Sequence, residues 1–79
     1  MNFETAAKKV ENNSKKINIT DKGILYGYYK QATVGDINIS KPLINPLEIG
    51  KWDAWNKCKG LSKIKAKEEY VKKVTSLGL

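Results

Sequence analysis

The sequence contains no histidine and only one cysteine, Cys58. Histidine is the commonest general base and a frequent zinc ligand, so its absence removes Ser-His and Cys-His catalytic arrangements and the usual metal sites. One cysteine cannot form a disulfide within the chain and does not make a set of metal ligands. We therefore expect a protein of a reducing compartment that is not an enzyme and holds no cofactor.

Long apolar runs are missing as well. No stretch approaches the ~20 apolar residues of a membrane span, and the start, MNFETAAKKVENNSKK, carries acidic residues where a signal peptide would be apolar. The 79 residues suffice for one small domain, residues 1–79, with no room for a second core. The sequence predicts a soluble, cytoplasmic, single-domain protein.

Arginine is also absent, and all 15 basic residues are lysines. Together with the 8 acidic residues they give a net charge of +7. Such a charge indicates an anionic partner, and nucleic acid, an anionic membrane surface or a phosphorylated small molecule would each fit. Arginine is preferred for reading guanine edges and narrow minor grooves, so its absence argues against base-specific recognition. Lysine still binds phosphate well as a point charge. A compositional bias that fills the surface with solvated lysines is the other explanation.

Apolar spacing and capping residues predict two helices in the first half of the chain. The first is expected over residues 3–13, where apolar side chains recur at helical spacing before the polar stretch ENNSKK. The second is expected to begin at Thr20 as its N-cap and to run to Val34. Gly35 can adopt the left-handed conformation that ends a helix.

Two further helices are predicted in the second half. Asn45 as N-cap and Pro46 at the first helical position begin a helix that should run to Gly60. Ser62 is the expected N-cap of the last helix, which Gly78 closes. No segment is expected to form a strand. The fold class is therefore all-α, a four-helix bundle.

The connection over residues 35–45 is long and contains Pro42. It is expected to be an ordered loop that crosses the bundle, with Ile37 and Ile39 packed on the core. Because it can span a whole helix length, it allows the second and third helices to run in the same direction.

Aromatic and cationic residues are concentrated in ILYGYYKQATVGDIN and KWDAWNKCKG. The candidate site residues are Tyr26, Tyr28, Tyr29, Lys30, Lys51, Trp52 and Tyr70. Lysines neutralise phosphate, phenols donate hydrogen bonds to phosphate oxygens, and aromatic rings stack on a flat base. Together they suit a phosphorylated nucleotide better than a long polyanion. The alternative is that the tyrosines and tryptophans are core residues, or a dry face for a protein partner.

These two segments resemble the acyl-CoA-binding protein family, whose hallmark segments read Y-x-x-Y-K-Q-A-T-x-G-D and K-W-D-A-W. The similarity extends over nearly the whole chain. It implies an up-down-down-up four-helix bundle with a long crossover between helices 2 and 3. It also implies a carrier, not an enzyme, that binds medium- to long-chain acyl-CoA esters and buffers or transports them within the cell. Nothing in the sequence pattern demands a dimer, so we expect a monomer.

The resemblance also assigns roles to residues. Tyr26, Lys30, Lys51 and Tyr70 match positions that hold the adenosine 3′-phosphate and its neighbourhood. Tyr28 and Tyr29 lie in the same hallmark segment. Trp52 matches a tryptophan near the ligand, and Trp55 matches a structural one. A further set, Phe3, Ala7, Val10, Val71, Val74 and Leu77, matches the seam between the first and last helices.

Three positions depart from the family pattern. Glu11 replaces a basic residue, so Lys15 and Lys16 are the expected auxiliary phosphate contacts. The segment LEIGKW is about one residue shorter than KGKAKW in relatives. Lys22 and Gly23 replace bulky apolar residues that help to line the acyl groove, which leaves the preferred chain length open.

The main alternative function is a small basic helical module that binds nucleic acid or anionic membrane surfaces through scattered lysines. That module would bind with steep salt dependence and without discriminating acyl-chain length. We expect instead an acyl-CoA ligand, no nucleic-acid partner and no transmembrane segment, with transient contact with a membrane surface possible.

Overall fold

The computed structural model describes residues 1–79 and contains four α-helices, one short 3₁₀ turn and no strand. The elements are α1 (Phe3–Asn12), η1 (Ser14–Lys16), α2 (Ile19–Thr33), α3 (Pro46–Asn56) and α4 (Lys63–Ser76). The prediction of an all-α fold is confirmed. None of the helices is both long and apolar enough to cross a membrane.

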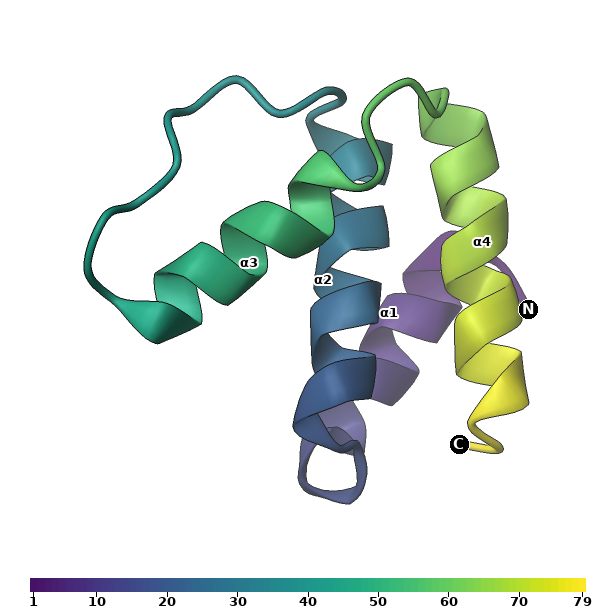
Figure 1. The fold of residues 1–79 in the computed structure, drawn as a ribbon. Helices are drawn as coiled ribbons and strands as arrows, with labels where there is room; N and C mark the ends of the chain where they lie inside the picture. The colour runs from purple at the N-terminus through teal and green to yellow at the C-terminus, as the bar shows by residue number, and fades with distance from the viewer.

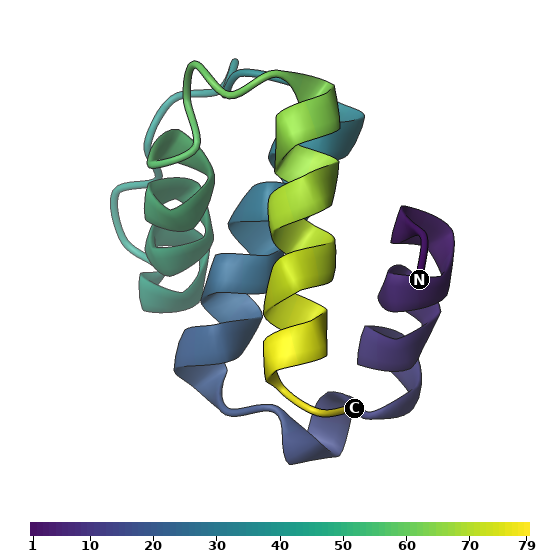
Figure 2. The same ribbon diagram turned by 90° about the vertical axis from the view of Figure 1, so that its right-hand side faces the viewer.

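The helices lie in the order α3, α2, α4, α1 across the molecule, because α2 packs against both α3 and α4, and α4 packs against α1 (Figure 2). In Figure 1, α2 and α3 run upwards and α1 and α4 run downwards. Turned upside down, this is the up-down-down-up arrangement that the family resemblance implies, in which the first and last helices run opposite to the two middle ones. The molecule measures 35 × 27 × 15 Å. Its thinness leaves no room for a closed chamber, so a ligand must bind at the surface.

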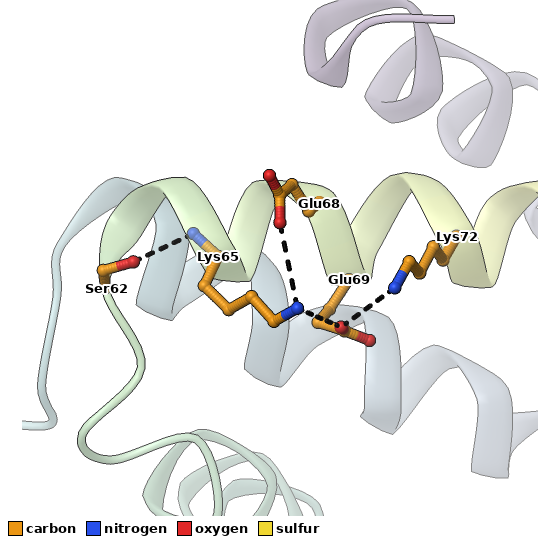
Figure 3. Close-up of polar contacts among 5 residues, drawn as sticks. All are labelled: Ser62, Lys65, Glu68, Glu69 and Lys72. Carbon is orange, nitrogen blue, oxygen red and sulfur yellow. Dashed lines mark hydrogen bonds and ion pairs between the residues drawn. The ribbon is translucent and has the colours of Figure 1, made fainter.

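Asparagine and serine side chains begin every α-helix. The side chain of Asn45 accepts hydrogen bonds from the amides of Leu47 and Glu48, and Ser62 accepts from that of Lys65, as predicted. Figure 3 shows the latter bond at the start of α4. Helix α2 starts at Ile19, close to the predicted start, but the prediction that Thr20 is its N-cap is wrong. Asn18 is the N-cap, and its side-chain oxygen accepts from the amide of Asp21.

The helix ends also differ from the prediction by a few residues. Helix α1 ends at Asn12, one residue early. Helix α3 ends at Asn56, not Gly60, and the residues up to Gly60 form turns. Both Gly35 (φ 103°) and Gly60 (φ 96°) adopt the left-handed conformation that a residue with a Cβ rarely takes. The role predicted for Gly35 is therefore confirmed.

The core lies where α1, α2 and α4 meet. Its buried members are Ala6, Ile17, Leu25, Tyr70 and Val74, and partly buried Phe3, Ala7, Val10, Tyr28, Val71, Leu77 and Leu79 pack around them. The whole seam predicted between the first and last helices belongs to this group. Only 11 of 79 residues are buried, so the core is thin and each contact carries a large share of the stability.

Helices α2 and α3 approach each other closely at Gly27. A Cβ added there would lie 2.4 Å from the backbone oxygen of Ala54, a separation that real Cβ atoms do not show. Glycine is thus required for the two backbones to come together. This contact sets how near the side chains of α3 can come to those of α2.

The hallmark residues Gln31 and Asp36 fasten the end of α2 to the turn between α3 and α4. Gln31 is fully buried, and its Nε2 donates to Asp36 Oδ1 at 2.7 Å and to the Leu61 carbonyl at 2.9 Å. The Gly60 amide donates to the same Asp36 oxygen at 2.9 Å. These bonds hold the pKa of Asp36 below its usual value, the Gly60 bond having the larger effect. Much of this hallmark segment is therefore structural.

The crossover between α2 and α3 swings away from the bundle (Figure 1). The expectation that its isoleucines pack on the core is wrong for Ile39, which is 57% exposed. Leu43 and Ile44 are exposed even more, at 92% and 89%. With prolines at 42 and 46, this segment cannot fold back as a helix onto the bundle.

Candidate functional site

Four side chains from α2 and α3 form a lysine–aromatic cluster: Tyr26, Lys30, Lys51 and Trp55. On α2 the tyrosine precedes the lysine by four residues, and on α3 the lysine precedes the tryptophan by four, so each pair shares one helix face. Because α2 and α3 run in the same direction, the pairs match crosswise. Lys51 Nζ lies 5.6 Å from the centre of the Tyr26 ring, and Lys30 Nζ lies 4.9 Å from that of Trp55.

The two ammonium groups of this cluster are available to an anion. Lys30 has no carboxylate within ion-pair distance. Lys51 lies 3.6 Å from Glu48, but both side chains are about half exposed and such a pair is weak. Both lysines are therefore held by the rings beneath them and can turn towards a phosphate.

Two lysines on α4, Lys65 and Lys72, already face carboxylates, as Figure 3 shows. Lys65 lies 3.8 Å from Glu68 and 3.4 Å from Glu69, and Lys72 lies 3.6 Å from Glu69. These ammonium groups already face carboxylates on their own helix. The net positive charge available to a ligand is thus greater at the lysine–aromatic cluster than along this side of α4.

An apolar hollow adjoins the cluster at Tyr26. This tyrosine hollow has a volume of about 220 Å³ and is lined by Val10, Lys22, Leu25, Tyr26, Tyr29 and Tyr70. Helices α1, α2 and α4 all contribute to it, since Val10 comes from α1 and Tyr70 from α4. A cationic, phenol-rich region therefore lies directly beside an oily one.

Three aromatic rings support the wall of the tyrosine hollow. Phe3 stacks on Tyr29 with 5.6 Å between ring centres, and it meets Tyr70 edge-on at 5.1 Å. Tyr29 and Tyr70 are 6.0 Å apart. Burial, and secondarily the neighbouring Tyr29, raises the pKa of Tyr70. Its phenol is therefore neutral at pH 7 and can donate a hydrogen bond.

The structure thus brings together five of the predicted site residues, Tyr26, Tyr29, Lys30, Lys51 and Tyr70, in the cluster and the adjoining hollow. It does not bring Trp52 there. The Trp52 indole donates to the Ile39 carbonyl at 2.8 Å, and Lys41 Nζ lies 5.6 Å from its ring centre, so Trp52 braces the crossover.

Tyr28 also lies apart from the other tyrosines. With Ile24 of the same helix it lines a separate hollow of about 470 Å³ that includes Ala54 and Cys58. Burial raises its pKa, and Glu69 raises it further. On a helix, residues 26 and 28 point in directions about 200° apart, which explains why Tyr28 serves a different surface from Tyr26.

Lys15 and Lys16 lie outside the tyrosine hollow as well. They line a polar hollow of about 500 Å³ at the turn between α1 and α2, together with Glu11 and neighbouring polar residues. The cluster instead gains Trp55, to which the family resemblance assigns a structural role. Its indole donates to the Gly35 carbonyl at 2.8 Å while its face supports Lys30. The mirrored four-residue spacings in α2 and α3 are the sequence signal that could have revealed it.

Comparison with known proteins gives a consistent family assignment. The family model described as acyl CoA binding protein matches residues 1–74. An acyl-CoA-binding protein of Gossypium hirsutum is 46% identical over 76 residues, which cover 95% of this chain and 85% of that protein. The acyl-CoA-binding domain-containing protein 3 of Oryza sativa subsp. japonica is equally similar, but this chain spans only 49% of its length.

Solved structures agree with the sequence comparison. The crystal structure of Oryza sativa acyl-CoA-binding protein 2 superimposes with a TM-score of 0.86 at 43% identity, covering 95% of this chain and 84% of that one. The structure from Moniliophthora perniciosa gives a TM-score of 0.89 at 36% identity, covering 95% and 76%. With a family model that matches nearly its whole length, this chain belongs to the acyl-CoA-binding protein family.

Proposed function

We propose that the chain binds long-chain acyl-CoA thioesters and carries them within the cell, without catalysing a reaction. The observation that carries this proposal is the direct contact between the lysine–aromatic cluster and the tyrosine hollow, which meet at Tyr26. Such a pair of surfaces fits a ligand with a phosphorylated head and an apolar tail. The names of its relatives support the same ligand class.

The head of the ligand binds at the cluster in this proposal. Lys30 and Lys51 leave their aromatic rings to meet the 3′-phosphate of the CoA adenosine, and Tyr26 and Tyr70 donate hydrogen bonds to it. Charge-assisted hydrogen bonds of this kind contribute about 1.5–3 kcal/mol each. An adenine ring placed beside the phosphate can stack on an aromatic face.

The acyl tail binds along the apolar side chains between the helices. Each buried methylene contributes up to about 0.8 kcal/mol. Four more methylenes therefore favour a longer chain by about 3 kcal/mol, or roughly a hundredfold in affinity, until the apolar surface is filled. Head and tail must be joined for the full affinity.

The carrier is proposed to act as a cytoplasmic monomer.

The single cysteine gives no sign of a catalytic role. Cys58 is unpaired and buried, and burial raises the pKa of its thiol. A thiol with a raised pKa is a poor nucleophile at neutral pH. This supports a binding role in preference to catalysis.

Isothermal titration calorimetry with palmitoyl-CoA, CoA, palmitate and duplex DNA tests the proposal. Palmitoyl-CoA should bind far more tightly than either CoA or palmitate, because only the thioester engages both surfaces. DNA should bind weakly, with a steep salt dependence. Equal affinity for palmitoyl-CoA and its two separated parts would refute the carrier function.

A further inference from the structure

Lys22 is the only charged residue that lines the tyrosine hollow. It lies on α2, eight residues before Lys30, which corresponds to about 12 Å along the helix axis towards the N-terminus. Lys22 and Tyr26 are four residues apart and share one helix face. The hollow therefore has the lysine–aromatic cluster at one end of this face and the ammonium group of Lys22 at the other.

The charge of Lys22 is not compensated by the protein. Lys22 forms no ion pair, and no carboxylate lines the hollow. The adjacent Asp21 is engaged with Lys73 at 2.8 Å. On α1, Glu11 follows Val10 but lines the other, polar hollow. None of the elements that form the hollow thus supplies an anion for this lysine.

Lysine can line an apolar surface with its methylenes while its ammonium group stays in water. Lys22 is exposed, which fits this arrangement. A ligand tail that ends in a methyl group gains nothing from the ammonium group. A tail that ends in a carboxylate can pair with it at the rim, where both charges keep part of their hydration and the cost of desolvation is small.

We propose that Lys22 makes this protein accept acyl-CoA thioesters whose tail ends in a carboxylate, that is, CoA monothioesters of dicarboxylic acids. The inference rests on the proposed function, since it assumes that the head binds at the lysine–aromatic cluster. The cluster then holds the phosphates, the hollow holds the methylenes, and Lys22 holds the far carboxylate.

The test compares CoA thioesters in pairs of equal chain length that end in either a methyl or a carboxylate group, in the octanoyl, lauroyl and palmitoyl series. Calorimetry measures both dissociation constants for the native chain and for Lys22→Met. For each pair, the ratio of interest is the dissociation constant of the carboxylate ligand divided by that of the methyl ligand. In at least one pair, Lys22→Met should raise this ratio by about fivefold to tenfold, because the substitution removes an exposed ion pair and adds apolar surface.

Two controls isolate the charge at this position. Lys22→Arg keeps the charge and should keep the native ratio. Lys8→Met removes a lysine that is exposed on α1 and forms no ion pair, so it changes the net charge equally and should also keep the ratio. Circular dichroism melts confirm that each variant is folded.

An unchanged ratio in Lys22→Met for every pair would overturn the inference. Equal weakening of CoA and of both thioesters would also overturn it, since it would place Lys22 at the phosphates of the head. If the native chain binds palmitoyl-CoA tightly and the ratio does not move, only this inference fails. If the native chain binds none of the thioesters, the proposed function fails with it.

Discussion

Replacing Gly27 with alanine tests the packing that places Lys51 beside Tyr26. The added Cβ would lie 2.4 Å from the oxygen and 2.8 Å from the carbon of the Ala54 carbonyl, which both belong to the backbone of α3. A backbone atom cannot rotate away, so α3 must move off α2. Overpacking of this kind costs about 1–3 kcal/mol, whereas alanine alone would favour the helix by up to about 1 kcal/mol. We expect a net loss of roughly 1–2 kcal/mol in the free energy of unfolding.

Urea and thermal unfolding, followed by circular dichroism, measure this loss. In a domain of this size each kcal/mol lowers the Tm by about 4–8 °C. Gly23→Ala is the matched control in the same helix, because its Cβ meets nothing within 4 Å. It should raise stability by about 0.4–1 kcal/mol through its effect on the unfolded chain.

The same variant links packing to binding. A shift of α3 would carry Lys51 away from Tyr26, so Gly27→Ala should also bind palmitoyl-CoA more weakly at temperatures where it is folded, while Gly23→Ala should change affinity much less. A Gly27→Ala chain as stable as the native one would show that the two helices do not approach as closely as described.

The remaining predictions concern the site and the fastening of α2. Lys30→Ala and Lys51→Ala should each weaken palmitoyl-CoA binding by more than about 1 kcal/mol without unfolding the domain; calorimetry that finds no change in either would contradict the proposed phosphate site. Tyr70→Phe should lower affinity if the hydroxyl binds phosphate, and unchanged affinity would leave Tyr70 a core residue only. The lowered pKa of Asp36 stabilises the fold above the ordinary aspartate pKa of about 3.9 and ceases to do so as the pH falls through the folded-state pKa. Asp36→Asn should therefore reduce stability at pH 7, and urea unfolding should show the difference shrinking on acidification; a difference independent of pH would exclude this role.

The helices and their order could be predicted from the sequence because local signals and the family resemblance agreed. Asn45 and Ser62 lie directly before apolar helical patterns, and Gly35 lies directly after one, where a glycine is expected to end the helix. The error at Thr20 arose because Asn18 and Thr20 are both good N-caps and only the geometry of the turn decides between them. The expected burial of Ile39 failed because sequence hydrophobicity does not reveal whether a loop has anything to pack against.

Within the site, residue type was easier to predict than direction. The structure places Tyr26 and Tyr29 of the tyrosine-rich segment at the tyrosine hollow, whereas Tyr28 lines another surface. Trp55 was not predicted as a site residue because its contact with Lys30 joins two helices whose relative rotation is set by the Gly27 contact. The matching four-residue spacings in α2 and α3 show that such a pairing is possible, but the packing of the two helices decides whether it forms.

The outlying crossover marks the place where the polypeptide can most readily change length. Its tip, Leu43 and Ile44, touches so little of the rest that extra residues there would disturb neither the core nor the ligand surfaces. Doubling the length of a flexible loop costs only about 0.6 kcal/mol in closure entropy. A peptide tag or a whole inserted domain should therefore be tolerated at this tip, which offers a route for coupling this domain to another protein.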